Sequence, residues 1–144
     1  MTNCAKRILI VDDNYELLKL LELLFKRDGF DVVTADDGDA ALEAFSSREF
    51  DLVLLDIMIP GPDGYEVCNH IRCELHSDIP VVMLSSLDSM LDEERSMDAG
   101  ATDHVAKPFS KDELLALVRQ YAGKSHAELC PPVQALPKHR RRTR

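Results

Sequence analysis

Five short apolar runs, each followed by a segment with apolar residues at helical spacing, constrain the fold of this chain of 144 residues more than any other feature. The runs are KRILIVDD (6–13), DVVTA (31–35), DLVLLD (51–56), IPVVMLSS (79–86) and ATDHVA (101–106), and the segments are residues 14–30, 36–50, 64–75, 88–100 and 110–122. Strands that are apolar on both faces and alternate with helices form parallel sheets covered on both sides. We therefore predict one doubly wound, three-layer α/β domain.

Polar residues stand where several of these predicted strands end. Asp12 and Asp13 end the first strand, Asp56 ends the third, Ser85 ends the fourth, and Lys107 follows the fifth. In sheets of this kind, ligands bind outside the carboxyl ends of the strands, where the strand order reverses. The sequence thus predicts that these side chains meet in one site.

Three carboxylates in one small site repel one another unless a cation lies among them. Mg²⁺, which keeps several waters and takes one or two carboxylates, fits this donor set better than Ca²⁺. An ammonium and a hydroxyl beside the metal are the groups that stabilise a phosphoryl group in transfer, so Asp56 is a candidate nucleophile that would carry an acyl phosphate. Taken singly, however, each aspartate is most often a helix cap or a turn residue.

The joint pattern is more specific than its parts. "DD" after the first strand, "D" before "PGPDG", "S" ending the fourth strand and "KPF" at 107–109 resemble the receiver domain of two-component response regulators over residues 6–122. The resemblance implies a flavodoxin-like (βα)5 three-layer sandwich, with a parallel five-stranded sheet in the order 2-1-3-4-5. It also implies a phosphoacceptor signalling domain that self-phosphorylates from phosphodonors and dephosphorylates itself, and is not otherwise an enzyme.

The resemblance further implies a role for each matching position. Asp56 would take a phosphoryl group from a sensor histidine kinase or phosphotransfer protein. Asp13 would bind Mg²⁺ directly and Asp12 largely through water, and the backbone carbonyl of Met58 would complete the metal ligands.

Two further positions would contact the phosphoryl group itself. Lys107 would pair with its oxygens, and Ser85 would hydrogen-bond to them and act as a switch residue. The Lys107–Pro108 peptide bond would be cis.

Three positions depart from the usual pattern of the receiver family. His104 occupies a switch position that usually carries Tyr or Phe, which would make activation depend on pH where imidazole titrates. Ser85 replaces the commoner threonine. Met58 and Leu87 are apolar at the mouth of the site and offer no group to orient a hydrolytic water, so a long-lived acyl phosphate is expected.

The resemblance also implies how the signal leaves the domain. Phosphorylation would remodel the face built from the fourth helix, fifth strand and fifth helix, at about residues 89–99, 103–106 and 110–121. This face would contact an output domain or target protein, or form a homodimer. Whether the chain is a stand-alone receiver or part of a longer regulator stays open.

The C-terminal segment differs in composition from the rest of the chain. Residues 123–144 contain three prolines and most of their charges are basic, although the whole chain has a net charge of −9. We predict a receiver domain at 1–122 and a flexible, proline-containing basic tail at 123–144. No nucleic acid is expected to bind the receiver itself, no apolar run suggests a membrane span, and a cytoplasmic location is predicted.

Two other functions remain open at this stage. A phosphohydrolase would share the Asp56 chemistry, although Ile57 and Met58 follow Asp56 where aspartate-based phosphatases carry a second acid. A binding module that has lost phosphorylation is the other, and the intact acids, serine and lysine count against it.

Overall fold

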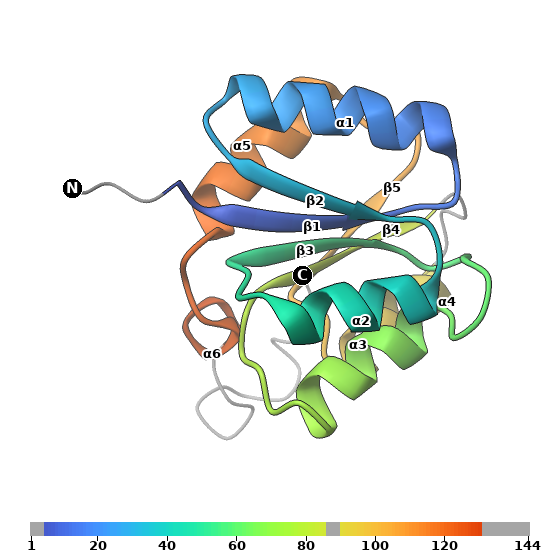
Figure 1. Cartoon of the computed structure of the whole chain (residues 1–144). Helices are drawn as coiled ribbons and strands as arrows, with labels where there is room; N and C mark the ends of the chain where they lie inside the picture. Colours follow the sequence, from blue (N-terminus) through green and yellow to red (C-terminus); the bar gives the residue numbers. More distant parts are fainter. Residues whose placement is uncertain (1–4, 86–89, 131–144) are drawn as a thin grey trace.

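The computed structural model describes residues 5–85 and 90–130, with only the backbone described at 90–93. Five parallel strands form one sheet in the order β2-β1-β3-β4-β5 (Figure 1). The strands are β1 (Arg7–Val11), β2 (Asp31–Ala35), β3 (Leu52–Asp56), β4 (Val81–Ser85) and β5 (Asp103–Ala106). The parallel sheet and the strand order predicted from the sequence are both confirmed.

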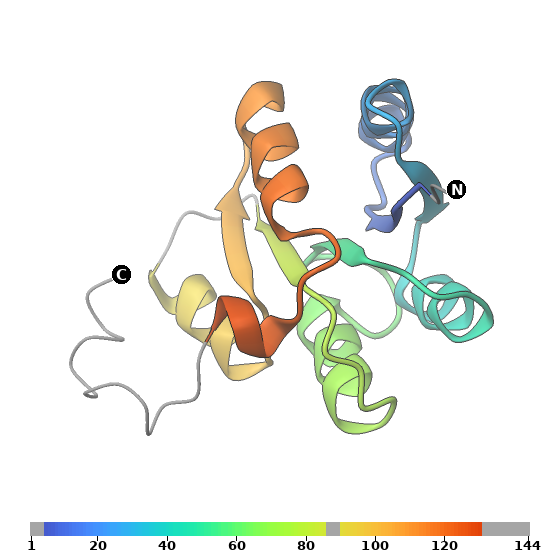
Figure 2. The ribbon, with the colours of Figure 1, turned by 90° about the vertical axis from the view of Figure 1, so that its left-hand side faces the viewer.

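Helices cover both faces of this sheet and make the molecule three layers thick. They are α1 (Tyr15–Arg27), α2 (Gly38–Ser47), α3 (Gly64–Cys73), α4 (Met90–Asp98), α5 (Lys111–Tyr121) and the short α6 (His126–Leu129). Figure 2 shows α1 and α5 on the upper side of the sheet and α2, α3 and α4 on the lower side. No helix within the described residues is both long and apolar enough to cross a membrane.

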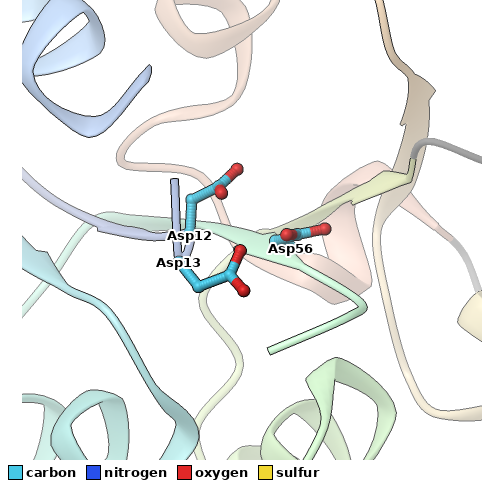
Figure 3. Close-up of side chains that lie close together, drawn as sticks. All are labelled: Asp12, Asp13 and Asp56. Atoms are coloured by element: carbon cyan, nitrogen blue, oxygen red, sulfur yellow. The ribbon is translucent and has the colours of Figure 1, made fainter. Parts of the chain in front are cut away.

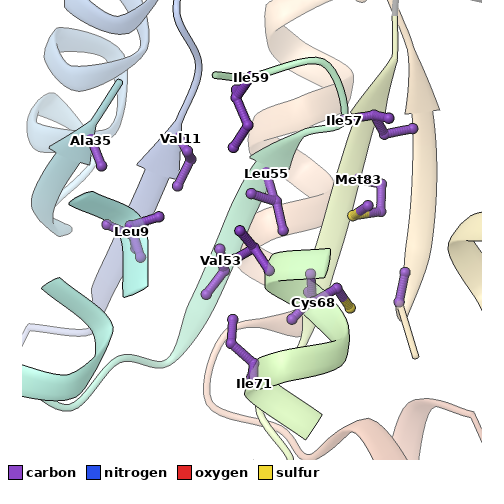
Figure 4. Packing of buried hydrophobic residues seen from close by; sticks show 14 of the residues in the cluster. Leu9, Val11, Ala35, Val53, Leu55, Ile57, Ile59, Cys68, Ile71 and Met83 are labelled. Atoms are coloured by element: carbon purple, nitrogen blue, oxygen red, sulfur yellow. The ribbon is translucent and has the colours of Figure 1, made fainter. Parts of the chain in front are cut away.

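Side chains of the central strands alternate between two cores. Ile8 and Ile10 of β1 lie in the core under α1 and α5, with Phe25 as its largest fully buried side chain. Leu9 and Val11 lie in the opposite core, against α2 and β3 (Figure 4). Because both faces of β1 are buried, the whole strand reads as an apolar run in the sequence.

The pairing register brings the polar ends of the strands together. Val11 of β1 pairs with Leu55 of β3, so the next residues, Asp12 and Asp56, lie side by side at the carboxyl edge of the sheet. A slip of one residue would turn every side chain of the strand to the opposite core. The core therefore fixes which acids meet at this edge.

Residues other than these acids cap the helices. Asn14, Asp37, Asp63 and Ser110 are the N-caps of α1, α2, α3 and α5, and each side chain accepts a hydrogen bond from a backbone N–H of the first turn. Asp12 accepts from the Asn14 N–H at 2.9 Å, which is a turn contact made by one of its two oxygens. Helix capping thus does not explain why three acids stand at the carboxyl edge.

At the opposite, amino edge of the sheet, Arg72 at the end of α3 joins three segments. Its guanidinium donates to the carbonyl oxygens of Gly100 (2.9 Å), Ser77 (3.1 Å) and Ile79 (2.6 Å). A fourth, longer contact reaches the Thr102 hydroxyl at 3.4 Å. These bonds tie the chain entering β4 and β5 to α3.

Helix α6 lies within the stretch that the sequence assigned to a flexible tail. His126 donates its backbone N–H to the Asp78 carbonyl at 2.6 Å, and its Nδ1 lies 2.8 Å from the Thr102 hydroxyl. The Cys130 thiol contacts the Thr102 carbonyl at 3.5 Å. The contacts of the domain therefore continue to residue 130, whereas the predicted flexibility of residues 131–144 lies outside the described part of the chain.

Candidate phosphoacceptor and metal site

Three carboxylates converge at the carboxyl edge of the sheet. Asp12 and Asp13 follow β1 and Asp56 ends β3, and Figure 3 shows the three side chains grouped together. One oxygen from each carboxylate lies within 4.8 Å of the others. Asp12 is fully buried and Asp56 is 5% exposed, whereas Asp13 is exposed to solvent.

Among residues 5–85 and 90–130, one ammonium faces this cluster. Lys107 Nζ lies 2.7 Å from Asp12 Oδ2 and 3.5 Å from Asp56 Oδ2, so its nearer partner is Asp12. Its backbone N–H donates to the Ser85 carbonyl at 2.6 Å, which fixes the start of the chain after β5 against β4. The Lys107–Pro108 bond is cis, as expected.

One ammonium does not neutralise three carboxylates, and the pKa of Asp56 reflects this. Burial, followed by the charge of Asp12, raises that pKa from 3.8 to about 6, against the opposing effect of Lys107. A carboxyl with such a pKa in a partly open site is typical of functional sites. The cluster therefore has room for a further positive charge.

The donors fit a hard divalent cation. Carboxylate oxygens from Asp12, Asp13 and Asp56 are the ligand type that Mg²⁺ prefers, and exposed Asp13 leaves one side of the site open to water. Met58, whose carbonyl was the fourth predicted ligand, has a side chain 62% exposed and a backbone N–H that lies 3.4 Å from Asp56 Oδ1. Met58 thus lies beside the carboxylates, with its side chain directed away from the core.

The two predicted switch residues lie on neighbouring strands. Ser85 ends β4 and is buried, one residue beyond the Leu84 that pairs with Asp56. His104 lies in β5, pairs with Met83 of β4 and is half-buried. Among the described residues, its Nε2 has no hydrogen-bond partner. Leu87, the second apolar residue predicted at the mouth of the site, lies outside the described residues.

The face predicted to carry the signal makes contacts with other parts of the domain. The Arg95 guanidinium of α4 lies over the Tyr65 ring of α3, 4.6 Å from its centroid. Arg119 of α5 forms an ion pair with Asp28, which caps the end of α1. Both cations are thus engaged in contacts within the domain.

Sequence reasoning missed two glycines that shape the loop after β3. Gly38 begins α2 and Gly64 begins α3, and each donates its N–H to a carbonyl of that loop. The glycine of "PGPDG" at position 64 was visible as a turn signal, but the proximity of Gly38 depends on how α2 packs and has no local signal.

The family model described as the response regulator receiver domain matches residues 8–119. Among solved structures, the chain is similar to the BeF3-activated N-terminal receiver domain of Klebsiella pneumoniae RstA, with 36% identity and a TM-score of 0.75 over 81% of this chain and 97% of that one. It is also similar to the receiver domain of Francisella response regulator 1452 (30%, TM-score 0.77, 81% and 95%). A third similar structure is the Borrelia burgdorferi CheX-CheY-BeF3-Mg²⁺ complex (30%, TM-score 0.74, 80% and 87%).

Proposed function

Because the chain belongs to the response regulator receiver domain family of two-component systems, a family of signalling domains, we propose that it accepts a phosphoryl group on Asp56. The donor would be a sensor histidine kinase or a phosphotransfer protein. The product would be an aspartyl phosphate that changes how the domain binds its target.

One observation supports this proposal above all others. Asp56 is nearly buried and lies among two further acids, and within the described residues one ammonium, Lys107 at 3.5 Å, and the Met58 N–H at 3.4 Å offset its charge. A structural carboxylate would normally have its charge matched by nearby donors. An unmatched acid at the ligand-binding edge of the sheet is the arrangement that a phosphoacceptor with a cation partner requires.

The transfer step needs few protein groups. An oxygen of Asp56 forms a bond to phosphorus as the N–P bond of the donor phosphohistidine breaks, and its electron pair stays on the imidazole, which takes up a proton. Lys107 pairs with the phosphoryl oxygens and the Ser85 hydroxyl donates to them. Asp12, Asp13, Asp56 and the Met58 carbonyl would hold Mg²⁺, which supplies charge neutralisation to the phosphoryl oxygens.

Switching would follow from the new charge. A phosphoryl group on Asp56 attracts Ser85, and the space that Ser85 leaves lets His104 turn inward. His104 is half-buried, and within the described part of the chain its buried Nε2 has no hydrogen-bond partner, which is consistent with a residue that has a second position available. The signalling face of α4, β5 and α5 would then bind an output domain, a target protein or a second copy of the chain.

The acyl phosphate is proposed to be long-lived. Met58 is exposed beside the site and offers only an apolar side chain, so it cannot orient a water for attack on phosphorus. Leu87 is also apolar and would likewise be unable to orient a water.

Incubation with acetyl phosphate and Mg²⁺, followed by intact mass measurement, tests the proposal. We expect a gain of one phosphate that is absent in Asp56→Asn and in EDTA, and that persists in Asp98→Asn, which changes an exposed acid of α4. Label on Asp56→Asn would contradict the assignment of the acceptor. No label on wild type would favour a binding module that has lost phosphorylation, and many turnovers on a phosphomonoester would favour a phosphohydrolase.

A further inference from the structure

A backbone hydrogen bond closes the loop between β3 and α3, residues 57–63. The Gly64 N–H, just after the loop, donates to the carbonyl of Ile57 at its start, at 2.8 Å. A Cβ at Gly64 would lie 2.6 Å from both the Asp56 carbonyl oxygen and the Ile57 Cα. Only glycine allows this approach, because real Cβ atoms do not come that close to backbone.

A second contact holds the middle of the same loop against α2. The Gly38 N–H donates to the Pro60 carbonyl at 3.0 Å. A Cβ at Gly38 would lie 2.1 Å from the Pro62 carbonyl oxygen and 2.9 Å from the Pro62 Cγ. Gly38 is not among the positive-φ glycines, so space rather than backbone conformation requires glycine here.

These contacts surround Met58, the proposed carbonyl ligand. Ile57, which lies beside β4, and Ile59 flank Met58 and are buried in the same hydrophobic core (Figure 4), whereas Met58 is exposed. The backbone at Met58 is thus fixed by two buried neighbours, and the far part of the loop is fixed by Gly38. Loss of the Gly38 contact would free the loop on the side that faces α2.

We propose that Gly38 is a positioning residue for the metal site: its lack of a side chain lets the first turn of α2 hold the 57–63 loop so that the Met58 carbonyl stays beside Asp56. The inference rests on the proposed function, since it assumes that Mg²⁺ binds at Asp12, Asp13 and Asp56. Residues that orient metal ligands without touching the metal typically change metal affinity by about tenfold or more when altered.

Gly38→Ala tests this role. The added methyl must push Pro62 away, and we expect the dissociation constant for Mg²⁺, measured by calorimetry on the full chain, to rise about tenfold. Hydrogen exchange in residues 57–63 should become faster in the same variant. Ala44→Gly is the matched control, because it weakens the same helix in its last turns, away from the loop, and should leave Mg²⁺ affinity unchanged.

A measurement on wild type keeps the proposal testable if Gly38→Ala does not fold. Titration with Mg²⁺ should slow exchange of the Gly38 and Gly64 amides together, because both donate to the loop that carries Met58. Slowing at Gly64 alone would overturn the role of Gly38. The role of Gly38 would also be overturned if a folded Gly38→Ala protein bound Mg²⁺ with a dissociation constant within twofold of that of Ala44→Gly. Neither result would contradict the proposed function. Wild type that binds no Mg²⁺ would overturn the proposed function and this inference with it.

Discussion

The two edges of the sheet both bury charged side chains, but they treat the charge in opposite ways. At the amino edge, the Arg72 guanidinium donates to three backbone carbonyls. At the carboxyl edge, the near-buried carboxylates of Asp12 and Asp56 lie together, and in the part of the chain that the structure describes Lys107 is the one cation beside them.

The difference shows at which edge the charged side chains already have the partners that they need. Backbone carbonyls satisfy the donors of Arg72, and the opposite charge of Asp78 lies nearby, so the amino edge needs no further group. The carboxyl edge holds more negative than positive charge among the described residues, and burial, followed by the charge of Asp12, raises the pKa of Asp56 there. We therefore expect substitutions at the amino edge to lower stability, and substitutions at the carboxyl edge to raise it while abolishing binding.

The largest effect is expected from Arg72→Met, which removes the donors from three carbonyls. Each buried acceptor left without a partner costs about 1–3 kcal/mol, so the free energy of unfolding in urea should fall by about 3 kcal/mol. Arg48→Met, at an exposed arginine, should change it by less than about 0.5 kcal/mol. Equal losses in the two variants would mean that the Arg72 contacts do not stabilise the amino edge.

At the carboxyl edge, Asp56→Asn should have the opposite sign. Without metal at pH 7.5, it should raise the free energy of unfolding by up to about 3 kcal/mol, because each unit of raised pKa disfavours the charged folded form by about 1.4 kcal/mol. Urea unfolding in EDTA measures this, with Asp98→Asn as the control. A loss of stability would show that the charge of Asp56 is well matched after all.

The same gain should depend on pH in a direction unusual for an acid. Between 3.8 and about 6, folded wild type holds a proton on Asp56 that the unfolded chain has lost. The destabilising contribution of Asp56 is therefore full above about pH 6 and fades as the pH falls toward 4. The stability difference between Asp56→Asn and wild type should shrink over that range, and a constant difference would contradict the raised pKa.

Mg²⁺ should stabilise the protein against unfolding only by binding to the carboxylates at the carboxyl edge. At ten times its dissociation constant, a bound ion raises the free energy of unfolding by about 1.4 kcal/mol. Thermal unfolding should show this increment in wild type and in Arg72→Met, and not in Asp13→Asn. An increment retained in Asp13→Asn would place the ion elsewhere.

The smallest effect is expected at α6. The Val81 N–H and the Arg72 guanidinium both donate to the Thr102 hydroxyl oxygen. The hydroxyl therefore donates its own proton to His126 Nδ1. The docked imidazole must then be neutral, and burial followed by Arg72 lowers its pKa, against the opposing charge of Asp78. The contact of α6 with Thr102 should be fully formed above about pH 6.5, and it should weaken as the pH falls below that value.

Hydrogen exchange at residues 125–130, corrected for intrinsic rates, checks this prediction. Protection should drop severalfold from pH 7.5 to pH 5 in wild type. In Thr102→Val, which lacks the hydroxyl, protection should be low at both values. Protection that stays high at pH 5 in wild type would mean that the imidazole does not control docking.

The sheet and the acids at its carboxyl edge could be predicted because their signals are local. The apolar runs of β1, β3 and β4 end in polar residues, and the strand order then brings Asp12 beside Asp56. The preference of Lys107 for Asp12 in this structure could not be predicted, since it depends on where a flexible side chain finds the nearest charge. The contact of Gly38 with Pro62 likewise depends on the packing of α2.

Helix α6 was missed for a different reason. A helix of four residues next to prolines shows no hydrophobic period, so the segment was predicted as part of the tail. Its capping box, in which Ser125 and Glu128 bond each other's backbone N–H, was a local signal that could have found it. Its docking depends on Thr102 and Asp78, which are distant in sequence.

The position of β1 between β2 and β3 has a consequence for the order in which the protein is made. Both neighbours of β1 exist once the ribosome has added Asp56, so the nascent chain can already bring Asp12 and Asp56 together. Lys107 is synthesised much later. Until then, Asp12 and Asp56 would lack their nearest ammonium, and cations of the surrounding solution would help to screen their charges.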